Sequence, residues 1–205
     1  MSANTKYVPT TSAGRMINDP PIARFLFSDV RVAWFWLILR LYLGYEWFSA
    51  GLHKIEDVKW VGTGEALKGF WVNAIKIPET GRPAISFDWY RNFIAWMLDN
   101  EAYTWFGKVV AYGELLIGAA LVLGAFVGIA AFFGAFMNWN FIMAGAASTN
   151  GMLLVIALFL MMAWKVAGYY GADYLLLRYI GVPWTGGEDA TVTPVKTGKL
   201  NPGLR

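Results

Sequence analysis

Fifty consecutive residues, from Leu115 to Trp164, contain no aspartate, glutamate, lysine or arginine. A helix that crosses a bilayer needs about 20 apolar residues, so this run is long enough for two spans and a turn. Over the whole chain 57% of residues are hydrophobic and 15% are charged, against roughly 25% charged in soluble domains. The sequence therefore favours a membrane protein over a soluble enzyme.

Breaks in the apolar pattern divide the chain into four predicted spans. Turn residues at 148–151 and glycines between 124 and 128 separate helices at 106–124, 128–148 and 152–170, and an earlier helix covers 33–52. Residues 53–103 form a long outer loop. An even number of spans puts both termini on one side, which we expect to be the cytoplasm. The predicted fold class is all-α, a four-transmembrane-helix bundle.

Short amphipathic helices are expected outside the spans. In the outer loop Trp89, Phe93 and Trp96 recur at helical spacing, which indicates a helix lying on the outer membrane interface. Residues 62–71 show a weaker pattern, and a solvated loop with aromatic anchors is the alternative. The N-terminal segment 1–32 is expected to contain an interfacial helix at 20–27. The tail 185–205 is polar and expected to be disordered. Asp173 is expected to cap a short helix that ends at Gly181.

Three charged side chains fall near the middle of the predicted spans, namely Arg40, Glu46 and Glu114. Each costs about 2.5 to 3.5 kcal/mol at the centre of a span, so we expect each to face a partner, a cavity or a substrate. Arg40 shares a helix face with Gly44 and Gly51, where another helix can approach closely. On that face Arg40 is expected to meet backbone carbonyls or a carboxylate.

Counting the helix rise from the outer ends predicts a polar layer at one depth, formed by Glu46, Glu114, Asn138 and Asn140. Three basic side chains above this layer form a predicted cationic rim: His53, Lys54 and Lys108. Two acids in one apolar layer are typical of groups that donate or relay protons. The alternative is that the four polar side chains only join the helices through hydrogen bonds.

The composition also limits the chemistry. With no cysteine and one histidine, the chain cannot supply the ligands of an iron-sulfur cluster, a thiolate zinc site or a bis-histidine haem. We therefore expect no metal or haem within the chain. The net charge of +3 is small and the basic residues are dispersed, so nucleic-acid binding is not expected.

Several short motifs resemble the DoxX/DoxD family of four-helix membrane proteins. They comprise Arg40, Gly44, Gly51 and Lys54 in the first span, Gly113-Glu114 with Gly118 and Gly124 in the second, and Gly171-Ala-Asp173 after the fourth. The resemblance covers residues 33–184. Its long loop is more similar to the DoxD branch, the membrane subunit of thiosulfate:quinone oxidoreductase, which works with a small partner called DoxA.

The resemblance implies a quinone-interacting subunit of a thiosulfate-type oxidoreductase in a prokaryotic inner membrane. Glu46 and Glu114 would relay protons to the quinone, and the basic rim, with Arg40, Asn138 and Asn140, would bind the sulfur anion. Because no residue of the chain can hold an electron, either the anion reacts directly with the quinone or a DoxA-like partner or larger complex carries the redox centre.

Two other functions stay open. One is a non-catalytic accessory subunit of a larger membrane-bound energy-converting complex, held through the glycine faces of its helices. The other is a small-molecule carrier, which is disfavoured because the chain shows no internal repeat.

Overall fold

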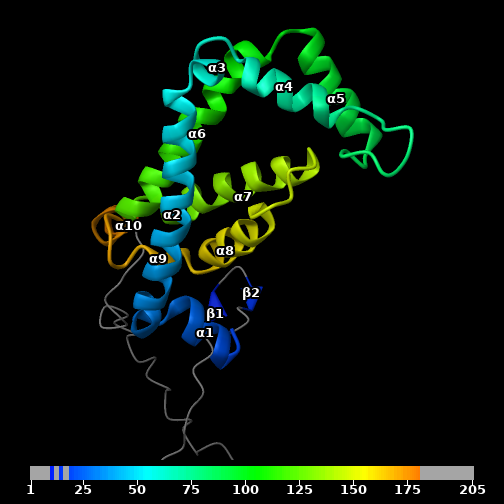
Figure 1. The fold of residues 1–205 in the computed structure, drawn as a ribbon. Coiled ribbons are helices and arrows are strands. Elements are labelled where there is room, and N and C mark those ends of the chain that lie inside the picture. Colours follow the sequence, from blue (N-terminus) through cyan, green and yellow to red (C-terminus); the bar gives the residue numbers. More distant parts are fainter. Residues whose placement is uncertain (1–9, 12–13, 16–18, 181–205) are drawn as a thin grey trace, which may run out of the picture.

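A computed structural model describes residues 10–11, 14–15 and 19–180. Apart from two strands of two residues each, its regular elements are helical, which confirms the all-α class (Figure 1). The elements are β1 (Thr10–Thr11), β2 (Gly14–Arg15), α1 (Pro21–Ser28), the 3-10 turn η1 (Val30–Val32), α2 (Ala33–Glu56), α3 (Val58–Val61), α4 (Glu65–Ala74), α5 (Asp88–Asp99), α6 (Tyr103–Leu123), α7 (Val127–Met143), α8 (Asn150–Met162), α9 (Trp164–Ala167) and α10 (Asp173–Ile180). The predicted tail lies outside the described residues.

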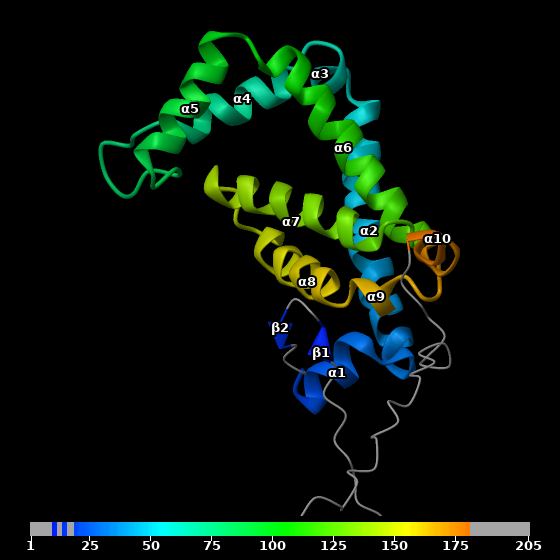
Figure 2. The same cartoon turned by 180° about the vertical axis from the view of Figure 1, so that it is seen from behind.

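Two pairs of helices form the body of the molecule. The helix α2 packs along α6, and α7 packs along α8. Figures 1 and 2 show that α7 and α8 run across α2 and α6 rather than beside them. The arrangement is therefore two crossed helix pairs. It differs from the predicted four-helix bundle, in which all four helices would lie along one axis.

Within the described residues, α6 is the one helix that is both long and apolar enough to cross a membrane. The apolar helices α7 and α8 have 17 and 13 residues, about 26 and 20 Å of rise, against roughly 30 Å of hydrocarbon. The predicted helices 128–148 and 152–170 were too long. Because residues 115–164 carry no charge, the pattern could not locate the turn at Gly145, whose φ is +89°, or the break at Ala163 between α8 and α9.

The helices α2 and α6 approach each other along a seam of glycines. Gly51 lies against the backbone nitrogen of Leu115, and Gly118 lies against the backbone of Phe48, so a Cβ at either glycine would overlap the other helix. The predicted close approach at Gly51 is confirmed. These contacts place α2 and α6 antiparallel, with residue 51 level with residue 115.

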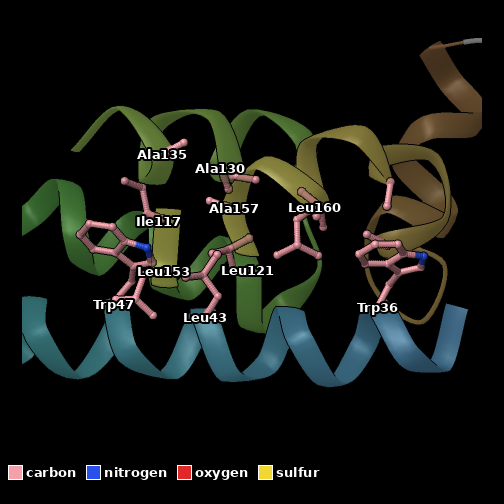
Figure 3. Close-up of a cluster of buried hydrophobic side chains, with 14 of the residues drawn as sticks. Trp36, Leu43, Trp47, Ile117, Leu121, Ala130, Ala135, Leu153, Ala157 and Leu160 are labelled. Atoms are coloured by element: carbon pink, nitrogen blue, oxygen red, sulfur yellow. The ribbon is translucent and has the colours of Figure 1, made fainter. Parts of the chain in front are cut away.

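Two apolar clusters hold the elements together. The first lies where α2 and α6 meet the second pair, and Figure 3 shows ten of its side chains labelled: Trp36, Leu43, Trp47, Ile117, Leu121, Ala130, Ala135, Leu153, Ala157 and Leu160. The second joins α3, α4 and α5 into an arm, residues 58–102, through Leu67, Trp71, Ile85, Tyr90, Ile94 and Met97 among others. This second core also includes side chains from the start of α6 and the end of α7, to which it attaches the arm.

The predicted amphipathic helices of the outer loop are present as α4 and α5. On α5, Ile94 and Met97 are buried while Trp89, Phe93 and Trp96 are exposed. The aromatic stripe thus points away from the arm's core, as an interfacial helix requires.

A single added methyl group tests the glycine seam. We expect Gly51→Ala to lower the stability of the detergent-solubilised protein by about 1 to 3 kcal/mol, because the Cβ overlaps backbone that cannot move aside. The control is Gly151→Ala, where nothing lies within 4 Å of the added atom. Equal thermal unfolding midpoints for the two variants would contradict the close approach of α2 and α6 at Gly51.

Candidate functional site

A hollow of about 320 Å³ lies between α2, α6, the turn that joins α7 to α8, and the arm. Its apolar wall is formed by Trp47, Ala50, Trp60, Phe70, Phe141, Ala146 and Leu153, and its polar wall by Glu46, Lys54, Glu114, Thr149 and Asn150. A mainly apolar hollow with a few converging polar groups is the usual form of a small-molecule site.

The main polar feature of the hollow is an ion pair between Lys54 and Glu114. The Lys54 ammonium donates to Oε2 of Glu114 over 2.6 Å and lies 5.1 Å from the centre of the Trp60 ring. The Glu114 side chain is 1% exposed and that of Lys54 is 19% exposed. The glycine seam creates this pair, because it brings the end of α2 level with the middle of α6.

Glu46 lines the same hollow at a different height. With residue 51 level with residue 115, Glu114 is level with residue 52, which is six residues from Glu46, about 9 Å along the helix axis. The expectation of one common depth for Glu46 and Glu114 assumed that α2 and α6 end level with each other. In fact Gly107 of α6 lies against the carbonyl of Trp60 in α3, so α6 extends beyond the end of α2 into the arm.

The two predicted asparagines have separate surroundings, and neither lines the hollow. Asn138 is completely buried, and neither of its amide atoms has a partner among the described residues. The Asn140 side-chain oxygen accepts from the Tyr90 hydroxyl over 3.1 Å, and its amide nitrogen donates to the Phe136 carbonyl over 2.8 Å. Burial raises the pKa of Tyr90, and its hydroxyl is the donor that joins the arm to α7.

The predicted cationic rim is not assembled. His53 and Lys108 are exposed and do not line the hollow, whereas Lys54 does. Because the Lys54 charge is balanced by Glu114, the hollow offers an anion no unpaired cation from this group.

Arg40 lies near the other end of α2, away from the hollow. Its Nη2 donates to the Tyr170 carbonyl over 3.0 Å, which confirms the expected contact with a backbone carbonyl. Arg40 is 1% exposed, and its guanidinium fills the space left by Gly124 and Gly171, where a Cβ would meet Nη1. Arg40 thus joins the turn after α6 to the segment before α10. It was predicted to bind substrate, but it lies apart from the hollow.

Asp173 completes this joint in a way that the sequence did not predict. Its carboxylate accepts from the backbone nitrogens of Phe126 and Val127 over 2.6 and 2.8 Å. Asp173 thus caps the start of α7 from a distance, whereas the prediction had it capping the helix that it begins. The tight turn, in which Phe126 has a φ of +49°, turns these N–H groups toward α10. Burial raises the pKa of Asp173, and the two backbone N–H groups and Arg40 oppose this shift.

Sequence reasoning missed the aromatic wall of the hollow. Trp47 and Phe141 belong to the body, while Trp60 and Phe70 belong to the arm. No local pattern marks these four rings, because they meet only when the arm folds over the α7 to α8 turn. Thr149 and Asn150 lie in the predicted turn, and their place in the hollow had no sequence signal.

Within the described residues, no group of three or more His, Asp or Glu side chains is arranged to hold a metal ion. Comparison with known protein families, with curated proteins and with solved structures finds no match to this chain.

Removing one member of the ion pair should expose its energetic role. We expect Lys54→Met to destabilise the protein by about 3 to 5 kcal/mol, because it leaves a buried carboxylate without its counter-charge. Adding Glu114→Gln should recover part of that loss, giving a measurable coupling in a double-mutant cycle of unfolding free energies. The control is Lys108→Met at an exposed position, and strictly additive effects of the two pair mutations would contradict the pairing.

The joint at Arg40 and Asp173 gives a second prediction. Asp173→Ala should cost about 1 to 2 kcal/mol, the range for losing a helix N-cap, and should increase hydrogen exchange at the first turn of α7. Asp99→Ala, at an exposed position, is the control. Unchanged exchange at Phe126 and Val127 would show that the cap is not formed.

Proposed function

We propose that this chain is a multi-pass membrane protein whose hollow binds a quinone. In this proposal the pair of α2 and α6 crosses the bilayer, and the pair of α7 and α8 is embedded in it at an angle. The support is the outward face of all four helices, which carries many large apolar side chains. Exposed examples are Ile38, Leu41, Leu116, Leu123, Phe133, Phe136, Val155 and Leu158. Helices that are apolar all round belong in a protein core or in lipid.

The observation that carries the quinone proposal is the ion pair of Lys54 and Glu114 in the wall of an aromatic hollow. A quinone head group is a flat, mainly apolar ring with polar oxygens, and the rings of Trp47, Trp60 and Phe141 offer flat apolar contacts. The volume of about 320 Å³ falls at the lower end of the usual range for ligand pockets, about 300 to 1,000 Å³. A head group fits, and an isoprenoid tail would extend toward lipid.

The polar wall suits the protons of quinone reduction. A quinone that accepts two electrons also takes up two protons, and these must reach its oxygens inside an apolar site. Glu46 and the Glu114 pair both stand on the wall of the hollow. In the proposal they relay protons to the reduced ring.

Electron transfer from a sulfur anion is assigned to a partner subunit. Lys54 is neutralised by Glu114, and His53 and Lys108 lie outside the hollow, so the anion finds no preformed cationic site beside the quinone. Membership of the DoxX/DoxD family and a DoxA-like partner therefore enter as parts of the proposal, supported by the motifs of the sequence.

The accessory-subunit alternative depended on glycine faces that are free to bind a partner. Gly44 and Gly51 are used inside the chain against α6, Gly124 against Arg40, and Gly128 against Trp164. These surfaces are therefore occupied within the chain, which leaves the quinone site as the better supported function.

The test uses the full chain in lipid nanodiscs. Wild-type protein should bind decylubiquinone in calorimetric titrations. When the partner subunit is added, the protein should also support the reduction of decylubiquinone by thiosulfate. Glu114→Gln and Glu46→Gln should each lower the reduction rate by about 10²-fold or more, the usual contribution of a positioned proton donor.

The control for these variants is Glu101→Gln at an exposed position of the arm, which should reduce decylubiquinone at the wild-type rate. Thermal unfolding shows which variants are folded. Failure of the wild-type chain to bind decylubiquinone, or wild-type rates in both folded glutamine variants, would overturn the proposal.

A further inference from the structure

The Lys54 ammonium keeps hydrogen-bond donors that the fold does not use. An ammonium has three N–H donors. Glu114 accepts from one of them over 2.6 Å, and the other two have no acceptor within the described part of the chain. The Lys54 side chain is 19% exposed, against 1% for Glu114. Of the two members of the ion pair, Lys54 is therefore the one that a ligand can reach.

The neighbours of the ammonium place it at the wall of the hollow. Its nitrogen lies 5.1 Å from the centre of the Trp60 ring and donates to the Glu114 carboxylate. Trp60, Glu114 and Lys54 itself all line the hollow. Because Glu114 belongs to α6 and Trp60 to α3, the nitrogen lies where the body meets the arm. A molecule in the hollow therefore lies beside an ammonium that is fixed from two sides.

The polar wall of the hollow contains few groups that suit a quinone oxygen. The carbonyl oxygens of an oxidised quinone accept hydrogen bonds and cannot donate them. Glu46 and Glu114 are also acceptors when they are ionised, so in that state neither can bind such an oxygen. The Asn150 amide nitrogen already donates to a backbone carbonyl over 2.7 Å, and Thr149 is exposed. The unused N–H groups of Lys54 are the donors of this wall that best match a carbonyl.

We propose that Lys54 is the residue that binds the quinone oxygen, through one of its two unused N–H groups. In binding, Glu114 is a positioning residue, because it holds the ammonium at the wall of the hollow. Hydrogen bonds from a charged donor are roughly twice as strong as those between neutral groups, so this contact can orient a ring that otherwise makes only apolar contacts. The inference rests on the proposed function, and it names the member of the ion pair that meets the ligand.

Calorimetric titration with decylubiquinone, in nanodiscs of the full chain, separates the two members of the pair. Glu114→Gln keeps the ammonium and should still bind decylubiquinone. Adding Lys54→Met removes the ammonium without leaving a lone carboxylate. The double variant should therefore bind about tenfold more weakly than Glu114→Gln, the value of one hydrogen bond to a charged group. The matched control is Lys59→Met at an exposed position of α3, which should bind as the wild type does.

A second measurement needs no substitution of Lys54, so it applies even when the double variant fails to fold. Wild-type protein is labelled with the heavy nitrogen isotope at the lysine Nζ atoms, and decylubiquinone with the heavy carbon isotope at its carbonyls. Solid-state NMR of the complex should show a dipolar coupling between the two labels, because a hydrogen bond brings them close together. The same coupling should persist in Lys59→Met.

The outcomes distinguish the role of Lys54 from the proposed function. Bound decylubiquinone without a coupling, or equal affinities of Glu114→Gln and the double variant, would overturn the role of Lys54 and leave the quinone site standing. Absence of binding by the wild-type chain would instead remove the proposed function, and the role of Lys54 with it.

Discussion

The close approach of α2 and α6 is the constraint on which the rest of the structure depends. Where Gly51 and Gly118 lack side chains, the two backbones touch, and these contacts set residue 51 level with residue 115. That register brings Lys54 to Glu114. Without it, each of these side chains would be a lone charge in an apolar environment, at a cost of several kcal/mol. Glycine packing and charge pairing therefore depend on each other.

The crossed arrangement of the helix pairs explains where the hollow lies. At one end of α2 the pairs are held together by Arg40, by Asp173 and by the backbone of the turn after α6. Toward the other end α7 departs from α6, and the arm extends over the space between them. The arm is joined to α7 by Tyr90 and Asn140. A joint at one end and a hollow at the other is the consequence of two helix pairs that cross.

Buried polar groups in this protein differ in their partners, which are backbone groups in some cases and a side chain in another. Arg40 and Asp173 bind backbone groups of neighbouring segments, so their task is to hold the turns together. Glu114 is neutralised by a side chain that also lines the hollow. Asn138 has no partner within the described residues. Of these groups, Glu114 with its partner Lys54 is the one that lines the hollow.

The sequence alone determined the all-α class, the existence of the apolar helices, the amphipathic helix of the arm and the need for Arg40 and Glu114 to find partners. These follow from local periodicity and from the cost of burying charge. It also contained the two glycine faces, one ending in Lys54 and one carrying Glu114.

Only the tertiary structure decided that these two faces meet, that α6 extends past α2, and that Asp173 caps α7. It also decided that aromatic rings from the arm and from the body line one hollow. Register, helix crossing and long-range capping depend on contacts between segments far apart in the chain. Such contacts leave no periodic signal in the sequence of either partner.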